Sequence, residues 1–487
     1  MKIYILTLLS IMLLFCSCND YLDKDPENKV DVEDVDYSQT ENMFQPVSGV
    51  YAVTNTKMSS WAMYGLLSIR TDDVNKGSSA SDQGDLTYCK NFNYSLIADY
   101  WALNTTWKNL YELVQYSNAA LISLDKYAEF LTSESDKALN LQYKAEVRFI
   151  RAYALFYITR LWGDVPLLLN NDDVMTNLGK SSREDVYNFI ITEMDESAAN
   201  MPALRPNEMS YKGQATKYTA LALKAKASAD INDWDKVLDA TNQIIDSQKF
   251  TLFSDYYTYF KKPGRLCDET LFELQFSDLG AGSGTAYTSD AWFAFQGPRN
   301  GFEGSKISSG WGFLTPTDKL IQLFNTRNDN IRYKTTLLFA GTTTPEGDVL
   351  KPSTSDEGTD KVFNGKAYYP STDMTEGRTD YGMGNNIRMI RYSDILLLNA
   401  EAKVRKGQNG DTPLNLVRNR VGLSNISNAT LDQILEERRA ELACEWGERF
   451  FDLVRTDKAA STLPGFKTGE SEFYPIPQAQ KDLNPNL

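Results

Sequence analysis

The sequence contains no histidine among its 487 residues. This absence excludes a Ser-His-Asp triad, a Cys-His dyad and any metal site that uses imidazole ligands. An enzyme with this composition would have to rely on carboxylates, lysine, tyrosine or a bound cofactor. The range of catalytic chemistry open to the chain is therefore narrow.

Cysteine is scarce as well, with five residues in the whole chain. Two of them, Cys16 and Cys18, stand close together near the start. The other three (Cys89, Cys267 and Cys444) form an odd and widely spaced set. Such a set does not predict a disulfide framework.

A long hydrophobic run is the third absence. The apolar stretch at residues 3–15 follows a single basic residue, Lys2. It is shorter than the roughly 20 apolar residues that span a bilayer, and it is typical of a secretory signal peptide. Ser17 is a small residue at a cleavage position and Cys18 follows it, so we predict a lipoprotein signal at residues 1–17 with Cys18 as the acylated residue.

Two alternatives stay open for this segment. Cys16 could carry the lipid, although the bulky Phe15 before it makes it the weaker candidate. A plain cleaved signal peptide is the other alternative. The acidic composition of residues 18–40 predicts a solvated tether between the lipid and the folded body.

The net charge of the chain is −15. A chain this acidic repels nucleic acid and anionic membrane surfaces, so we expect no nucleic-acid partner. Hydrophobic residues make up 42% of the sequence and aromatic residues 12%. This content supports a large core, and we predict a single domain over residues 41–487.

Apolar residues recur at three- and four-residue steps in several segments, which is the period of one helix face. The clearest are residues 104–127 and residues 139–167, the second of which reaches a helix end at Gly163 and Pro166. Further helices are predicted at residues 183–200, 217–231, 234–247, 394–406 and 431–454.

One pair of these helices indicates the architecture. Small residues (Ala222, Ala225 and Ala229) line one helix, and Trp234 and Ala240 lie on the next, after a short polar turn. Small residues let two helices approach closely, as in a tetratricopeptide unit of about 34 residues. We predict a mainly α fold: a tetratricopeptide-like helical repeat scaffold over about residues 100–255 and 390–455.

Two regions lack this helical pattern. Residues 41–100 and 256–390 are rich in Gly, Ser, Thr, Asp and aromatics, which predicts long loops with short strands. Loops of this length in a compact domain are usually functional or disordered. We therefore expect the ligand-binding surface to lie in these two regions.

Aromatic residues in these regions are the main candidates for ligand contact. A tryptophan in a loop can lie flat at the surface and cover the apolar C–H face of a sugar ring, while local packing is the alternative role. The candidates are Trp61, Tyr64, Trp292 and Trp311, with Asp72, Asp73, Asn75 and Arg299 as partners for sugar hydroxyls. Tryptophans on or beside predicted helices are assigned to the core: Trp101, Trp107, Trp162, Trp234 and Trp446.

Acidic residues leave two further hypotheses open. A glycosidase would need two carboxylates that face each other across the scissile bond, and Asp72, Asp73 and Asp329 are acids in loop-like regions. We expect solvated loop acids there, and Asp329 leaves a structural calcium ion open. No cofactor is expected. In residues 434–455, acidic and basic residues stand three and four apart, which predicts ion pairs along a structural helix.

Several motifs together resemble the SusD/RagB family of outer-membrane lipoproteins. The sequence CNDYLDKDP at residues 18–26 is similar to the family's lipidated start, and AEVRFIRAYALFYITRLWGDVPLL to its arginine- and aromatic-rich helix. IRMIRYSDILLLNAEA is similar to its Arg-x-Ser-Asp-x-Leu-Leu signature, followed by LNLVRNRVGL and ILEERRAELACEWGERFFDLVR. FYPIPQAQKDLNPNL resembles the closing segment. The resemblance covers nearly the whole chain.

The resemblance implies a fold of paired helices of tetratricopeptide type that support a variable loop region. It also implies a protein anchored by lipid in the outer membrane and facing outward, which binds oligosaccharides and passes them to a SusC-like TonB-dependent transporter without catalysis. A peptide-binding lid of the RagB type, a carboxylate glycosidase and a structural repeat adaptor are the alternatives. The matched motifs belong to the scaffold, so they do not identify the ligand.

Overall fold

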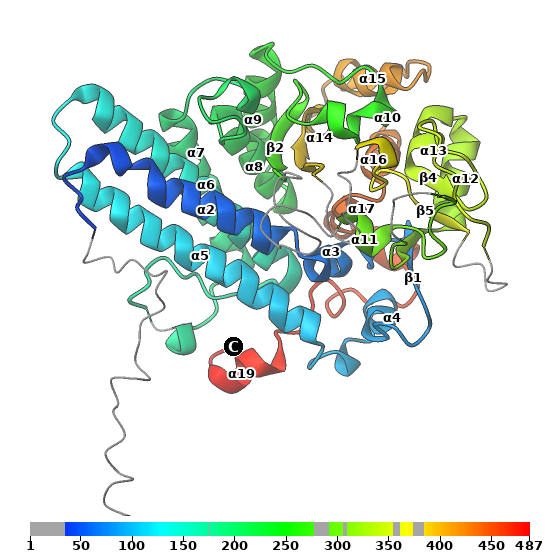
Figure 1. The fold of residues 1–487 in the computed structure, drawn as a ribbon, viewed down its shortest axis with the longest axis horizontal. Coiled ribbons are helices and arrows are strands. Elements are labelled where there is room, and N and C mark those ends of the chain that lie inside the picture. The colour runs from blue at the N-terminus through cyan, green and yellow to red at the C-terminus, as the bar shows by residue number, and fades with distance from the viewer. Residues whose placement is uncertain (1–34, 174, 277–291, 305–308, 354–360, 374–383) are drawn as a thin grey trace, which may run out of the picture.

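The computed structural model is mainly helical (Figure 1). It describes residues 35–173, 175–276, 292–304, 309–353, 361–373 and 384–487. None of the helices in this part of the chain is both long and apolar enough to cross a bilayer.

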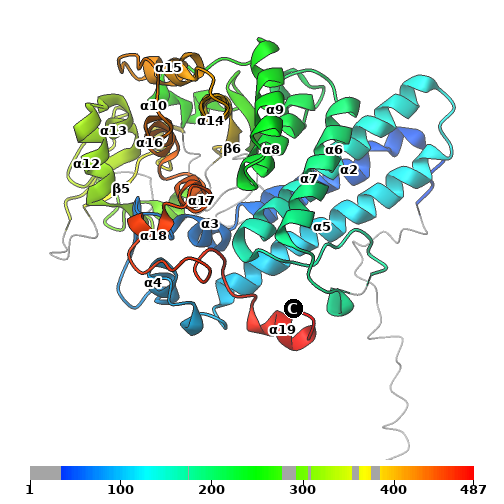
Figure 2. The ribbon, with the colours of Figure 1, turned by 180° about the vertical axis from the view of Figure 1, so that it is seen from behind.

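Successive helices pack side by side and form the scaffold. The helices α5 to α9 each contact their neighbour in the chain, and α9 also contacts α14. The bounds are α5 (Trp101–Ala128), α6 (Glu134–Trp162), α7 (Arg183–Asn200), α8 (Lys217–Asp230), α9 (Trp234–Asp246) and α14 (Tyr392–Arg405). Figures 1 and 2 show α5 and α6 as long antiparallel rods, with α7, α8 and α9 following them. The predicted tetratricopeptide-like repeat scaffold is confirmed.

Side-chain caps fix where several of these helices begin. The Oγ of Ser133 accepts a hydrogen bond from the backbone N–H of Asp136 at the start of α6. Ser182 caps α7 and Asp233 caps α9 in the same way. Such a cap satisfies one of the N–H groups that a helix start leaves without a partner.

Residues 41–100 differ from the prediction, because much of this segment is helical. It forms α2 (Phe44–Met58), α3 (Trp61–Ser68) and α4 (Asp85–Lys90). The sequence of α2 contains Gly, Pro, Val and Thr, which lower helix propensity. It is helical because Val47, Val50 and Met58 are buried, in a helix that packs against α5 and α6.

The other region contains the short strands that were predicted, together with short helices. Three antiparallel pairs join β1 (Val74–Gly77) to β3 (Phe313–Pro316), β2 (Thr270–Leu274) to β6 (Ile387–Arg391), and β4 (Leu337–Phe339) to β5 (Val362–Asn364). The helices are α10 (Tyr256–Tyr259), α11 (Trp292–Gln296), α12 (Asp318–Arg327) and α13 (Asn330–Thr336). The strand β1 thus links the early segment to the later one.

The segment predicted as one helix over residues 431–454 is two helices, α16 (Leu431–Leu442) and α17 (Glu448–Arg455). Gly447 lies between them at φ 71°, in the left-handed region that favours glycine. A Cβ at this position would stand 2.3 Å from the backbone oxygen of Leu67. The helix α16 ends before this glycine, because Ala443 is extended at ψ 139° and Cys444 is left-handed at φ 59°. Gly447, packed against the end of α3, is the residue that precedes α17.

Charged residues of α16 form a buried network with other segments. Arg332 has a side-chain exposure of 0% and pairs with Asp329, Glu437 and Glu441. Arg391 joins Glu441 to further acids at its other side. Most ion pairs of residues 434–455 join different elements, because a buried charge requires a partner. One pair does run along a helix, between Asp452 and Arg455 of α17 at 2.6 Å.

The remaining α-helices lie in the C-terminal part of the chain. The helix α15 (Asp411–Arg420) packs on α14, α18 (Ala459–Thr462) follows α17, and α19 (Gln478–Leu483) lies near the C-terminus against α5. Figure 2 shows α16 and α17 between the helical scaffold and the helices α12 and α13.

Candidate functional site

Five aromatic side chains from three parts of the chain form one group, here called the aromatic cluster. Its members are Trp61, Trp101, Phe295, Trp311 and Phe313. Trp61 is the first residue of α3 and contacts the other four. The early segment, the start of α5 and the later region thus converge on one indole ring.

Three rings of the cluster are stacked. The centroid of Trp61 lies 5.0 Å from that of Phe295, and Phe295 lies 4.8 Å from Phe313. The Phe295 and Phe313 rings are nearly parallel, with 17° between their planes. Phe295 and Phe313 are buried, at 0% and 2% exposure, while Trp61 is half-buried. The two buried rings therefore support Trp61 from the core side.

Trp101 is the most exposed member, at 43%. Its ring meets Trp61 edge-on, with centroids 5.0 Å apart, and its Nε1 donates a hydrogen bond to Oε1 of Gln83 at 3.1 Å. The same oxygen accepts a bond from the hydroxyl of Tyr100 at 3.1 Å. The assignment of Trp101 to the core is wrong, because the first residue of α5 extends beyond the packed part of the helix. Its position directly before a long helical pattern is the signal that could have identified it.

Trp311 forms the other side of the cluster. Its half-buried ring lies 5.9 Å from Trp61 at an angle of 83°, and its backbone N–H donates to the carbonyl of Ala294 at 2.7 Å. Trp101 and Trp311 thus both meet Trp61 edge-on, and all three indoles reach the surface. Such an arrangement offers several apolar ring surfaces to one ligand.

Polar residues lie beside the cluster. The Nζ of Lys76 is 5.7 Å from the centre of the Phe313 ring and donates to the carbonyl of Asp82 at 2.8 Å. Burial lowers the pKa of Lys76, and the nearby charge of Arg299 adds to this effect. The stem of Arg299 lies over Gly312, next to Trp311, and its side chain is exposed. Asn75, on β1, is also exposed.

Tyr64, predicted as a surface aromatic, lies in the interior with 2% exposure. Its hydroxyl donates to Oε1 of Gln296 at 2.9 Å and lies 3.0 Å from the carbonyl of Cys444. The reason is its place inside α3, where every residue from Ala62 to Ser68 is buried and only the first, Trp61, reaches the surface. Tyr64 therefore has no ring face to offer to a ligand.

Asp72 and Asp73 are also buried, at 6% and 2% exposure, and they are not solvated loop acids. Asp72 pairs with Arg449 at 3.1 Å, and Arg439 pairs with both acids. Although burial opposes the change, Arg449 and Arg439 lower the pKa of Asp72. Burial, supported by the charge of Asp72, raises the pKa of Asp73. These acids join β1 to α16 and α17, and this corrects their prediction as hydroxyl partners.

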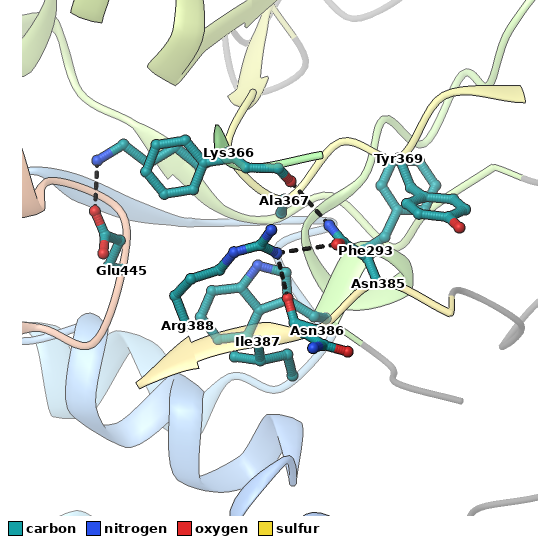
Figure 3. Close-up of a pocket in the computed structure, with 11 residues that line it drawn as sticks. Phe293, Lys366, Ala367, Tyr369, Asn385, Asn386, Ile387, Arg388 and Glu445 are labelled. Carbon is teal, nitrogen blue, oxygen red and sulfur yellow. Dashed lines mark hydrogen bonds and ion pairs between the residues drawn. The ribbon is translucent and has the colours of Figure 1, made fainter. Parts of the chain in front are cut away.

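Trp292 lies away from the aromatic cluster, 4.0 Å from Tyr64 and 5.1 Å from Trp446 between ring centroids. It lines a pocket of only about 30 Å³, shown in Figure 3. In this pocket Lys366 points to Glu445 at 2.7 Å, and Arg388 points to Asn385 at 2.9 Å. A volume near that of one water molecule cannot hold a sugar ring.

In the described part of the chain, no group of three or more Cys, Asp or Glu side chains is arranged to bind a metal ion. Asp329, which left calcium open, is 1% exposed and bonds to Nη1 of Arg332 at 2.7 Å. Its carboxylate is thus engaged by a buried arginine.

Two family models match the chain. The model of the SusD family matches residues 268–473. A second model, described as "Starch-binding associating with outer membrane", matches residues 20–228. The two matches lie one after the other and together cover most of the sequence.

Curated relatives extend over the same length. A SusD-like protein of Bacteroides ovatus is 24% identical, over 93% of this chain and 82% of the relative. The SusD-like protein P2 of Formosa agariphila is 23% identical, over 100% of this chain and 99% of the relative.

Solved structures share the fold. A laminarin binding SusD-like protein superposes with a TM-score of 0.76 at 24% identity, covering 91% of this chain and 97% of its own. The surface glycan-binding protein A of Bacteroides thetaiotaomicron, in complex with laminarihexaose, gives a TM-score of 0.75 at 25% identity, with the same coverage. Both printed names describe binding proteins.

Proposed function

The chain belongs to the SusD family, and from this premise we propose that it is a surface-exposed glycan-binding protein of the outer membrane. It captures oligosaccharides and delivers them to a SusC-like TonB-dependent transporter, and it performs no catalysis. The single observation that carries the glycan part is the aromatic cluster, with three indoles at the surface.

The geometry of the cluster suits a sugar ligand. A pyranose ring presents an apolar face of C–H groups and an edge of hydroxyls, so it needs a flat ring surface with polar groups beside it. Trp61 and Trp101 meet at 69°, so a glycan chain that turns between successive sugars can contact both. Arg299 is exposed beside Trp311 and would bind hydroxyls.

The glycan proposal is tested by titration of the soluble protein, starting after Cys18, with a panel of oligosaccharides. Laminarihexaose is the first probe, because it is the ligand in one similar structure. We expect the Trp101→Ala/Trp311→Ala variant to lose binding of whichever glycan the wild type binds. Tyr116→Ala is the control, because Tyr116 is 52% exposed on the same helix as Trp101 but outside the cluster.

A peptide ligand of the RagB type is the alternative that the same titration resolves. Binding of peptides, with no response to any glycan on the panel, would replace the glycan proposal. Equal affinity of the double variant and the control for a glycan would remove the aromatic cluster as its site.

The absence of catalysis is supported by the state of the candidate acids. The sequence has no histidine, and Asp72 and Asp73 both pair with Arg439, instead of facing each other across an open cleft. A glycosidase requires two carboxyl groups on opposite sides of the scissile bond. Long incubation with laminarihexaose should release no new reducing ends, and their release would establish an enzyme.

The lipid anchor rests on the sequence, because Cys18 lies outside the described residues. We propose that Cys18 is acylated and that residues 18–40 link the lipid to the folded body. Palmitate labelling in cells should mark the wild type, and Cys18→Ser should abolish the label. Labelling that persists in Cys18→Ser and disappears in Cys16→Ser would move the anchor to Cys16.

The transporter partner is inferred from the family. Native purification from membranes should recover the protein together with a β-barrel transporter. Recovery of the protein alone, under conditions that preserve known transporter complexes, would contradict this part of the proposal.

A further inference from the structure

A second cavity, of about 310 Å³, opens beside β1. This volume falls at the lower end of the range of about 300–1,000 Å³ that is typical of small-molecule sites. Its wall contains three basic residues, Arg70, Lys90 and Lys319, and two acidic ones, Asp72 and Asp318. Two of the predicted site residues, Asp72 and Asn75, lie in this wall, and no member of the aromatic cluster does.

Lys90 supplies the first positive charge of the wall. Its ammonium donates hydrogen bonds to the carbonyls of Thr71 and Val74, the latter at 2.7 Å. Both acceptors are neutral, and no carboxylate in the described part of the chain lies within 4 Å of its Nζ. Burial lowers the pKa of Lys90 to about 8, against the opposing effect of the carboxylates of Asp72 and Asp73. A third N–H of the ammonium has no acceptor among these bonds.

Arg70 and Lys319 add two more positive charges. Arg70 is 1% exposed, and only its Nη1 finds a hydrogen-bond acceptor, the carbonyl of Glu472 at 3.0 Å. Its Nε and Nη2 have no acceptor among the described residues, and the guanidinium lies 4.0 Å from the centre of the Phe450 ring. Lys319 is exposed at the start of α12 and makes no ion pair within the described ranges. A buried cation without an anionic partner leaves a positive potential in the surrounding space.

The acids of the wall do not cancel this charge. Asp72 is already shared between Arg439 and Arg449, at 3.0 and 3.1 Å. Asp318 is the other acid, and it is exposed to solvent at the first position of α12. Lys319, the residue next to it, is exposed as well, so these two opposite charges are screened alike, whereas Lys90 and Arg70 are buried and screened less. The cavity is therefore positive within a protein whose net charge is −15.

We propose that this cavity is a binding site for an anionic sugar unit, a uronate or a sulfated residue, whose acidic group is held by Lys90 and Lys319. Asn75 and Asn91 are exposed on the wall and offer amides to the sugar hydroxyls. Phe92, Leu463 and Pro464 form its apolar part. This combination of a few charged groups with an apolar wall is typical of a site that fixes the orientation of a small ligand.

The proposal that the anion belongs to a sugar rests on the proposed glycan-binding function. The cavity and the aromatic cluster lie beside the same strand, because Asn75 lines the cavity while the next residue, Lys76, reaches the ring of Phe313. The positive charge of the cavity, however, depends on none of the indoles. The two sites can therefore fail or hold independently.

The test compares ligands that differ only in their acidic group. Trigalacturonate is titrated against its methyl ester, and galactose 6-sulfate against galactose. Wild type should bind at least one anionic ligand about tenfold more tightly than its neutral match, and the pair that shows the difference identifies the anion as carboxylate or sulfate. Raising the salt concentration from 50 to 300 mM should reduce this preference, because screening weakens the attraction.

Variants locate the preference in the cavity. Lys319→Gln should reduce it several-fold, and Lys180→Gln is the matched control, because Lys180 is an exposed lysine outside the wall of the cavity. Lys90→Gln should abolish it, with circular dichroism as the check on folding. Equal binding of charged and neutral ligands by wild type, or an equal effect of Lys319→Gln and Lys180→Gln, would overturn the proposal.

The same experiment separates this proposal from the glycan platform. Trp101→Ala should weaken neutral glycans at the aromatic cluster and leave the preference for the charged ligand intact. If neutral glycans bind and the charged ligand has no advantage, the anionic site fails while the platform stands. If only the charged ligand binds, and Trp101→Ala has no effect, the anionic site stands while the platform fails.

Discussion

Removal of the Trp101 ring should weaken glycan binding by about tenfold. A tryptophan has about 250 Å² of surface, so 43% exposure leaves about 110 Å² in contact with solvent. A sugar that covers about half of this area buries about 55 Å². At about 25 cal/mol per Å², Trp101→Ala then costs about 1.4 kcal/mol of binding free energy, which is about tenfold in Kd.

Isothermal titration with the glycan that binds wild type most tightly measures this effect. Trp101→Phe should keep much of the affinity, since it retains an aromatic face. Tyr116→Ala removes a ring from the same helix that is 52% exposed, somewhat more than Trp101, and should leave Kd unchanged. If Trp101→Ala folds normally and binds within twofold of wild type, the assignment of the cluster as the glycan platform is refuted.

Three further predictions concern orientation, stability and pH. Gln83→Met removes the oxygen that accepts both the N–H of Trp101 and the hydroxyl of Tyr100, so affinity should fall about threefold to tenfold by titration. The loss of two hydrogen bonds should also lower the free energy of unfolding, by about 1–3 kcal/mol. Gly447→Ala places an alanine in the left-handed region with its Cβ against the carbonyl of Leu67. Chemical denaturation should show that the free energy of unfolding falls by about 1–3 kcal/mol. Burial raises the pKa of Glu146 from 4.5 to about 7. The wild-type fold therefore loses stability progressively as pH rises through this window, because the carboxyl ionises more readily in the unfolded chain. Glu146→Gln does not ionise, so its stability should rise relative to wild type by up to about 3 kcal/mol between pH 4.5 and 7.

The Gly447 prediction has a matched control. Gly407 also has a positive φ, but no atom stands within 4 Å of the position of its Cβ, so Gly407→Ala should cost about 1 kcal/mol at most. Equal losses at Gly407 and Gly447 would contradict the packing argument. The Glu146 prediction fails if the stability difference between wild type and Glu146→Gln is the same at pH 4.5 and pH 7. The Gln83 prediction fails if Gln83→Met binds as wild type does.

The spacing of apolar and small residues predicted the helices of the scaffold well, because helix formation depends mainly on residues that are close together in the sequence. The three- and four-residue period of residues 104–127 and 139–167 corresponds to α5 and α6, and the small residues of residues 217–231 correspond to the close pair of α8 and α9. Caps such as Ser133 and Asp233 are local as well. The same local rules failed for α2, where contacts with α5 and α6 outweigh weak helix propensity.

The candidate site was predicted only in part. Trp61 and Trp311 were found from composition, since each stands in a segment rich in small and polar residues. Trp292 and Tyr64 stand in similar surroundings in the sequence and lie elsewhere, and Trp101 was placed in the core although it is exposed. Exposure of a ring depends on which other segments cover it, and composition does not contain that information.

The sequence by itself determined the helical periods, the helix caps and the charge of the chain, because these depend on residue type and on spacing within a few turns. Only the tertiary structure decided that Asp72 and Asp73 pair with arginines more than 360 positions away, and that three indoles meet at the surface. Ion pairs and aromatic clusters of this kind form between residues that the fold brings together from distant positions. Their partners follow from the packing of whole elements, and no local pattern specifies them.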